Sequence, residues 1–312
     1  MAKSIKKIGI VGTGVIGASW AACYLAHGFE VSASDPAPGA ERRLRRQVAR
    51  IWETLARNGA REGASLDRLA FDEDLAVALR DVDFVQENGP ERLEVKRRLL
   101  ADISAVIGND VIIATSSSGT MISDIQDAAI NPGRVVLGHP FNPPHLMPLV
   151  EVCGGRLTTP ECIERTLAFY GSIGKELIHL RQEIPGHIAN RLQAAVWREA
   201  FYLLDQGVAS VADIDRAVVH GPGLRWALQG PFMNLHLAGG AEGIGHAIDH
   251  LGPPIESWWR DLGDVAFTPS LRAKAIRGIA RGPDRRSIDD MVQARDDLLL
   301  ELLSLKSAIA GS

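Results

Sequence analysis

Two side chains near the middle of the chain have the types and surroundings needed to take a proton from a substrate. His139 ends an apolar run that begins at residue 135, and Glu151 stands between Val150 and Val152. Imidazole is the usual base near neutral pH, and a buried carboxylate can orient the ring and stabilise its charged form. An unpaired carboxylate in an apolar strand is costly, so Glu151 is expected to have a polar partner. We interpret the two as a candidate general base and its partner, with a structural hydrogen bond as the alternative.

A glycine-rich turn near the start of the chain has the spacing of a dinucleotide-binding site. Gly12, Gly14 and Gly17 follow an apolar run in the pattern G-x-G-x-x-G. The first glycine permits a tight turn, the second lets the backbone approach a pyrophosphate, and the third lets the next helix pack on the strand. A second expected strand, residues 30–34, ends at Asp35, where a ribose 2′-hydroxyl is held in such sites. Because a carboxylate repels a 2′-phosphate, the pattern predicts NAD rather than NADP; a purely structural glycine turn is the alternative.

The elements that must position these residues alternate between strands and helices. Expected strands lie at residues 8–11, 30–34, 69–71, 83–87, 111–115, 135–139, 149–152 and 176–180. This alternation predicts an α/β fold with a doubly wound, mainly parallel Rossmann sheet over residues 1–184. Ligands of such sheets lie beyond the carboxyl ends of the strands, where His139 and the serine run at 116–118 are expected. Pro185 and Gly186 interrupt the pattern, and an all-α C-terminal domain is predicted over residues 185–312. Its expected helices lie at about residues 188–206, 211–219, 234–250, 254–262 and 287–310.

Composition excludes several other classes of protein. The 312 residues carry a net charge of −4, which gives no basic face for nucleic acid. No apolar run approaches the ~20 residues of a membrane helix, and the first expected strand leaves no room for a signal peptide. The three cysteines have no metal or disulfide spacing, which suits a cytoplasmic protein. His246 and His250 are four residues apart but lack a third ligand, so no metal site is predicted.

Taken in order, several motifs resemble the 3-hydroxyacyl-CoA dehydrogenase superfamily over essentially the whole chain. The matching segments are residues 12–17 (GTGVIG), 87–91 (ENGPE), 116–119 (SSSG), 139–143 (HPFNP), 151 (E) and 185–191 (PGHIANR). The resemblance implies an NAD-dependent dehydrogenase in which His139 is the general base and Glu151 its partner. It also implies that Ser118 bonds the substrate oxygen and that Asn190 helps hold substrate and base.

The glycine turn and the resemblance together predict the contacts of the cofactor. These are Gly12, Gly14, Val15, Ile16, Gly17, Asp35, Asn88, Glu91, Lys96 and Ser116. The chain also departs from the family at His187, which stands before the Asn190 helix where the family usually has an aromatic or small apolar residue. Such departures leave the identity of the substrate open, but they do not change the reaction that the resemblance implies.

Within the superfamily, residues 33–40, 221–226 and 232–240 are most similar to the branches that oxidise L-carnitine and L-gulonate. These branches act on small free 3-hydroxy acids. A trimethylammonium group prefers aromatic faces, and a substrate carboxylate needs a cation. Side chains that could supply these contacts are Phe141, Trp197, Arg225, Trp226 and Phe232. Core or interface packing is the alternative for the aromatic residues.

Two other functions stay open at this point. Seven arginines between residues 42 and 61, on an expected helix from residue 41 to about 63, could hold the phosphates of coenzyme A in a dehydrogenase of CoA thioesters. A non-catalytic NAD-binding structural or sensor protein is the alternative of another class. The resemblance also implies a homodimer formed by the C-terminal helical domain, whose apolar helices need a cover.

Overall fold

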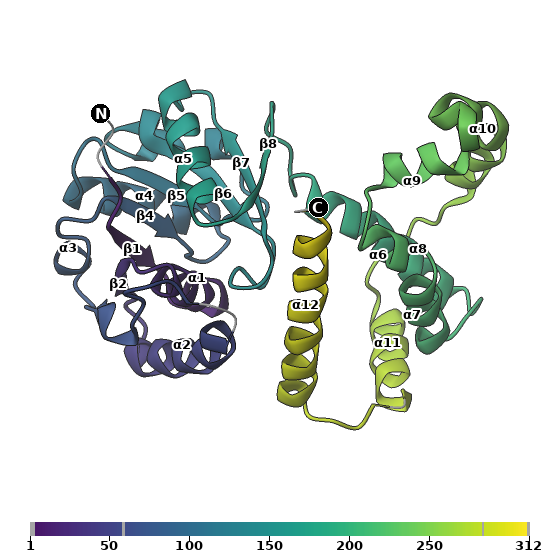
Figure 1. The fold of residues 1–312 in the computed structure, drawn as a ribbon, viewed down its shortest axis with the longest axis horizontal. Helices are drawn as coiled ribbons and strands as arrows, with labels where there is room; N and C mark the ends of the chain where they lie inside the picture. The colour runs from purple at the N-terminus through teal and green to yellow at the C-terminus, as the bar shows by residue number, and fades with distance from the viewer. Residues whose placement is uncertain (1–3, 58–59, 283, 311–312) are drawn as a thin grey trace. The chain divides into compact units, whose positions relative to one another are not determined.

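The computed structural model describes residues 4–57, 60–282 and 284–310. The chain divides into two compact units, Met1–Asn190 and Arg191–Ser312. The first unit contains the sheet, and the second consists of helices (Figure 1). The domain limits inferred from the sequence, 1–184 and 185–312, stay predictions.

An eight-stranded sheet forms the centre of the first unit, in the order β3-β2-β1-β4-β5-β6-β7-β8. Its strands are β1 (Lys7–Val11), β2 (Glu30–Ser34), β3 (Leu69–Phe71), β4 (Phe84–Glu87), β5 (Ile112–Thr115), β6 (Val135–Pro140), β7 (Leu149–Gly154) and β8 (Glu176–His179). Neighbouring strands run parallel, apart from the antiparallel pair β6 and β7. The predicted doubly wound, mainly parallel sheet followed by a helical domain is therefore confirmed.

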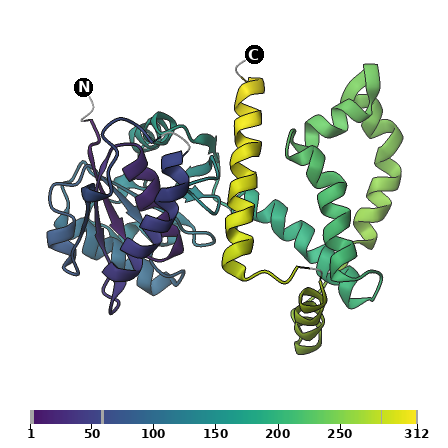
Figure 2. The ribbon, with the colours of Figure 1, turned by 60° about the horizontal axis from the view of Figure 1, so that its bottom comes forward.

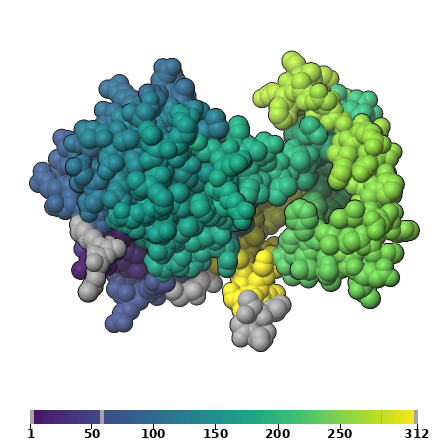
Figure 3. Space-filling view, turned by 90° about the horizontal axis from the view of Figure 1, so that it is seen from above, coloured from purple at the N-terminus to yellow at the C-terminus, as the bar shows by residue number. Residues whose placement is uncertain are grey.

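Each face of the sheet has its own hydrophobic core, because successive strand residues point to opposite faces. Ile8 and Ile10 of β1 pack into one core, whereas Val11 packs into the other. The first core receives α1 (Val15–Ala26), α2 (Ala40–Arg57) and α5 (Pro160–Ser172), and the second receives α4 (Leu93–Val106). A four-residue helix, α3 (Leu75–Ala78), precedes β4. Side chains of the first unit pack into a continuous surface in the space-filling view (Figure 3).

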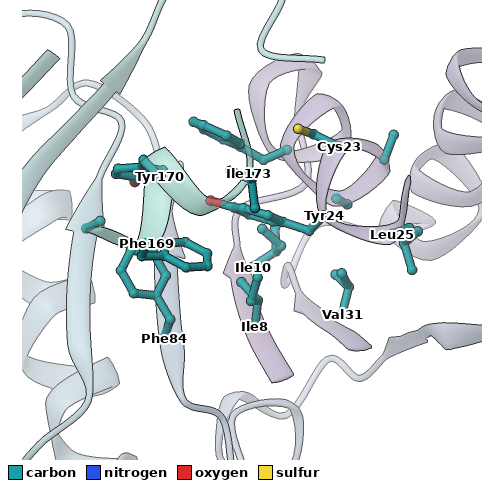
Figure 4. Close-up of a cluster of buried hydrophobic side chains, with 14 of the residues drawn as sticks. Ile8, Ile10, Cys23, Tyr24, Leu25, Val31, Phe84, Phe169, Tyr170 and Ile173 are labelled. Carbon is teal, nitrogen blue, oxygen red and sulfur yellow. The ribbon is translucent and has the colours of Figure 1, made fainter. Parts of the chain in front are cut away.

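Aromatic rings fill the first core (Figure 4). The ring centroids of Phe84 and Phe169 lie 4.4 Å apart, and Tyr24 and Tyr170 pack beside them. The two tyrosine hydroxyls donate to one buried acceptor, Gln86 Oε1, at 3.0 and 2.6 Å. A buried amide in this core therefore has its oxygen satisfied, as a buried polar group requires.

The regular elements that the structure describes in the second unit are all helices (Figure 2). They are α6 (Ala189–Asp205), which begins in the first unit, α7 (Val211–His220), α8 (Pro222–Trp226), α9 (Pro231–Ala238), α10 (Gly243–Asp261), α11 (Pro269–Arg281) and α12 (Ile288–Ala310). Within this unit α7 packs against α8 and α11, and α9 packs against α10. No helix in the described part of the chain has the length and apolar character to cross a lipid bilayer.

Two sequence expectations about helices need correction. The helix expected to reach residue 63 is α2, and residues 60–63 are not helical. A break expected near Pro253 and Pro254 does not occur, because both lie inside α10. The chain bends earlier, at Gly239 and Gly243, where a Cβ on Gly239 would lie 1.8 Å from the carbonyl oxygen of Gly243.

Candidate active site

The glycine turn has the shape that a pyrophosphate needs. A Cβ on Gly12 (φ +85°) would lie 2.8 Å from the carbonyl of Asn88, and one on Gly17 would lie 2.0 Å from the oxygen of Gly12. A Cβ on Gly14, in contrast, would meet nothing within 4 Å. Gly14 also caps α1 without a side-chain hydrogen bond, and Val15 at the start of the helix is exposed. The turn therefore presents open backbone and a helix N-terminus to a ligand, which fits the phosphates of a dinucleotide.

Asp35 is fixed beside this turn at the end of β2. Its Oδ2 accepts hydrogen bonds from the backbone N and the Oγ1 of Thr13, at 2.8 and 3.0 Å, and its Oδ1 accepts one from Ala37 N at 2.9 Å. A carboxylate oxygen can accept two hydrogen bonds, so Oδ1 keeps capacity for a ribose hydroxyl. Thr13, which has no predicted role in the glycine pattern, therefore orients the carboxylate of Asp35.

Asn88 and Ser116 come together at the ends of β4 and β5. Ser116 Oγ donates to Asn88 Oδ1 at 2.8 Å. The same hydroxyl accepts from Gln86 Nε2 at 2.9 Å and from Trp20 Nε1 at 3.2 Å. Gln86 therefore connects the aromatic core to the predicted cofactor site, a role that its place in an apolar strand did not reveal.

A buried ion pair lies under the segment after β4. Lys96 Nζ is 3.0 Å from Glu87 Oε2, and both side chains are about 1% exposed or less. Glu87 also accepts from Gly89 N and from Thr115 Oγ1, each at 2.5 Å, and Lys96 donates to the oxygen of Gly89 at 3.3 Å. Lys96 thus holds the backbone of Gly89, the residue after Asn88. A direct contact between Lys96 and the cofactor stays a prediction.

Glu91 holds the loop that carries Ser118. Its Oε1 accepts from Ser117 Oγ, from Gly119 N at 3.1 Å, and from Thr120 N and Oγ1, both at 2.9 Å. Burial raises the pKa of Glu91, but the Ser117 hydrogen bond and the Lys96 charge outweigh it and lower the pKa to about 2. The carboxylate is therefore ionised at neutral pH and orders this loop, in which Ser118 is exposed.

His139 and Glu151 lie directly opposite each other on the antiparallel strands β6 and β7. His139 Nδ1 is 3.0 Å from Glu151 Oε2, and both residues are buried. Glu151 Oε1 accepts from Ile188 N at 2.8 Å and Ala189 N at 3.1 Å, at the start of α6. Burial raises the pKa of Glu151, but the bonds from His139 and from these two amides outweigh it and lower the pKa. Because the carboxylate accepts at Nδ1, the proton of a neutral ring is held there and Nε2 keeps its lone pair.

Asn190 and His187 approach the same ring from the start of α6. Asn190 Nδ2 lies 3.5 Å from His139 Nε2. The ring centroid of His187 lies 4.9 Å from that of His139, and His187 Nε2 is 2.9 Å from the oxygen of Ser117. The structure thus brings His139, Glu151 and Asn190 close together and places His187 beside them, while their catalytic roles stay predictions.

The predicted substrate contacts belong to both units. Phe141 follows β6 in the first unit and is half-buried, and its backbone N bonds the oxygen of Leu149. The others are exposed side chains on helices of the second unit, and their part in the site stays a prediction: Trp197 on α6, Arg225 and Trp226 on α8, and Phe232 on α9. The described residues contain no group of three or more side chains that could hold a metal ion.

Comparison with known proteins shows similarity in sequence and in fold. Residues 7–184 match the family described as 3-hydroxyacyl-CoA dehydrogenase, NAD binding domain, and residues 186–264 match the C-terminal domain of that family. An L-carnitine dehydrogenase of Streptomyces coelicolor is 46% identical over 301 residues, which cover 96% of this chain and 95% of that protein. An L-carnitine dehydrogenase of Bacillus cereus is 45% identical over 302 residues, covering 97% and 93%. One solved structure matches 97% of this chain and 99% of its own chain, with a TM-score of 0.85 and 28% identity. It is 5-formyl-3-hydroxy-2-methylpyridine 4-carboxylic acid 5-dehydrogenase, described as an NAD⁺-dependent dismutase.

Proposed function

The chain belongs to the 3-hydroxyacyl-CoA dehydrogenase family and is an NAD-dependent dehydrogenase of CH–OH groups, and from that premise we propose that it oxidises L-carnitine to the 3-keto acid. L-Carnitine is a small free L-3-hydroxy acid. The proposal of this substrate is supported by the relatives of that name, which align with nearly the whole chain. Trp197, Trp226 and Phe232 are the aromatic side chains that we propose for the trimethylammonium group, since aromatic faces bind quaternary ammonium groups.

The observation that carries the proposed mechanism is the 3.0 Å contact between His139 Nδ1 and Glu151 Oε2. With Nδ1 held as a donor, Nε2 of His139 takes the proton of the substrate hydroxyl. Glu151 stabilises the imidazolium that forms, and the two amides at the start of α6 keep the carboxylate in place. Ser118 and Asn190 position the substrate oxygen. When bound, NAD supplies the group that accepts the hydride from the carbinol carbon.

The residues that hold NAD follow from the fit of the turn and the strand ends. The backbone of residues 12, 14 and 15–17 would hold the pyrophosphate, and Asp35, oriented by Thr13, would accept a hydrogen bond from the adenosine ribose. Asn88 and Ser116 line the next strand ends, where the nicotinamide half of a dinucleotide lies in such sheets. Glu91 and Lys96 act on this region through the segments that they hold.

A panel of substrates tests the proposal against its same-class alternative. NADH production is measured with L-carnitine, L-gulonate, 3-hydroxybutyrate and 3-hydroxybutyryl-CoA at equal concentrations. We expect L-carnitine to have the highest kcat/KM. Activity confined to the thioester would instead favour the coenzyme A alternative. Tight NADH binding without turnover of any member would favour a non-catalytic NAD-binding protein.

The helical unit supports a homodimer as part of the proposal. Among its described residues, Ala247 and Leu271 are the apolar side chains that are buried, whereas many large ones are exposed. Apart from the proposed substrate contacts, the exposed set includes Leu192, Leu224, Leu228, Met233, Leu237, Trp258, Trp259, Phe267, Ile276, Ile279, Leu298 and Leu305. So much apolar surface needs a cover, and a second copy of the chain supplies one. Light scattering should give twice the mass of the chain, and a monomer at micromolar concentration would contradict the dimer.

The location and remaining partners are proposed on chemical grounds. Cys23, Cys153 and Cys162 are buried free thiols, which suit the reducing cytoplasm. The net charge of −4 supports a small-molecule substrate rather than nucleic acid.

A further inference from the structure

His187 lies beside His139, and the proposed mechanism gives its side chain no task. It is 4% exposed, and its φ of +52° places it in the left-handed region that residues other than glycine rarely occupy. Gly186 before it has a φ of +76°. A backbone held in such a conformation needs contacts that stabilise it, and the side chain of His187 makes two.

Its first contact is a hydrogen bond to the strand end that carries Ser118. His187 Nε2 lies 2.9 Å from the carbonyl oxygen of Ser117. A carbonyl accepts only, so the hydrogen of the neutral ring is on Nε2. The hydroxyl of Ser117 donates to Glu91 Oε1. Ser117, the residue before Ser118, is therefore held at its hydroxyl by Glu91 and at its carbonyl oxygen by His187.

Its second contact is with the ring of the base, and the residues that follow it hold the carboxylate. The ring of His187 packs on that of His139, with centroids 4.9 Å apart and planes at 53°. The next two residues, Ile188 and Ala189, supply the amides that bond Glu151. One residue therefore touches the Ser118 segment, packs on the base, and precedes the amides that hold the carboxylate.

We propose that His187 is a positioning residue that fixes the place of Ser118 relative to His139 and Glu151, through the hydrogen bond from its Nε2 to the carbonyl of Ser117. The inference rests on the proposed function, because it concerns the alignment of the same reacting oxygen. Burial, and then the charge of His139, lower the pKa of His187, although the Ser117 bond and the carboxylates of Glu151 and Glu91 act the other way. The ring is therefore neutral at pH 7, and it adds no second positive charge when His139 takes its proton.

Two substitutions separate the hydrogen bond from the packing. His187→Phe keeps a flat ring beside His139 but removes the donor, which leaves the buried carbonyl of Ser117 without this partner. His187→Gln keeps an N–H at the distance of Nε2. Both carry the same backbone strain, so strain cancels in the comparison. With L-carnitine and NAD, we expect kcat of His187→Phe to fall about tenfold or more, and that of His187→Gln to stay within threefold of the unaltered enzyme.

Three further readouts distinguish positioning from a general loss of structure. The dissociation constant of NADH should change less than twofold in both variants. The deuterium isotope effect on kcat, with substrate deuterated at the carbinol carbon, should rise in His187→Phe because the chemical step becomes slower. In the ¹⁵N-histidine-labelled native protein, NMR should show a slowly exchanging Nε2–H that His187→Gln removes. An equal kcat and isotope effect in His187→Phe and the native enzyme would overturn the proposal, as would the absence of that NMR signal.

The design separates this inference from the proposed function. If the native enzyme turns over no hydroxy acid, the proposed function fails, and the NMR signal still tests the hydrogen bond. If the native enzyme is active and His187→Phe matches it, the role of His187 fails alone.

Discussion

Replacing Glu151 by glutamine removes one charge from the candidate site and keeps its shape. Glu151 is buried, with Oε1 bonded to two backbone amides and Oε2 bonded to His139 Nδ1. In Glu151→Gln the two amides keep the carbonyl oxygen on their side, so the amide nitrogen faces Nδ1. An N–H in that place donates to Nδ1 and shifts the ring hydrogen to Nε2, the atom that must accept the substrate proton.

The size of the effect follows from the lost charge. Two unit charges about 4 Å apart attract by about 4 kcal/mol at an effective dielectric constant of ~20. Glutamine withdraws this attraction from the imidazolium formed in the reaction, and about 1.4 kcal/mol is tenfold in rate. The charge alone therefore predicts a fall in kcat of about 10³-fold, and the changed tautomer lowers kcat in the same direction.

The assay is steady-state NADH production from L-carnitine at saturating NAD, together with NADH binding to show that the site is folded. Glu161→Gln is the matched control, because Glu161 is 62% exposed and pairs with Arg134 and Arg165 at the surface. We expect the control to keep full activity. A kcat of Glu151→Gln within threefold of the native value, with unchanged NADH binding, would refute the reasoning.

Three further predictions concern the cofactor site and its support. Asp35→Asn should raise the KM for NAD and increase kcat/KM for NADP relative to NAD, and an unchanged ratio of the two would count against the ribose contact. Lys96→Met should lower the free energy of unfolding in urea by about 3–5 kcal/mol, because Glu87 is left charged and buried. A loss below about 1 kcal/mol would contradict the importance of that ion pair. The pKa of Glu91, about 2 in the folded protein, lies below its value of about 4.3 in an unfolded chain, so its charge stabilises the fold above pH ~4.3 and ceases to do so as the pH falls toward 2. The difference in unfolding free energy between the native protein and Glu91→Gln should therefore be full at pH 6–7 and shrink between about pH 4.3 and 2, and a constant difference would contradict the shift.

Much of the sheet could be predicted because its signals are local. Short apolar runs separated by helical patterns are sufficient to place parallel strands, and the glycine turn marks the first crossover. The helical unit was less predictable. The helical pattern in the sequence does not mark α11, although Thr268 caps it and Pro269 begins it. It also divided α10 at its prolines, since the tolerance of a proline inside a helix depends on tertiary contacts that a local pattern does not contain.

The candidate site shows the same division between local and long-range information. A histidine and a glutamate in neighbouring apolar runs are visible in the sequence, and their pairing follows once β6 and β7 run antiparallel in register. Gln86 and Thr13 act through partners 20 or more residues away, so no spacing in the sequence reveals their roles. Glu87 pairs with Lys96 nine residues on, but it also accepts from Thr115, 28 residues away on the next strand. His187 was noticed as a departure from the family, but its contacts with Ser117 and His139 needed the folded chain.

The account depends most on His139 as the group that takes the substrate proton. The direct measurement is kcat for L-carnitine oxidation in His139→Ala, with the dissociation constant of NADH determined on the same sample. We expect kcat to fall about 10²–10⁴-fold, the usual contribution of a general base, while NADH binds within twofold of the native affinity. An unchanged kcat in His139→Ala would contradict the account.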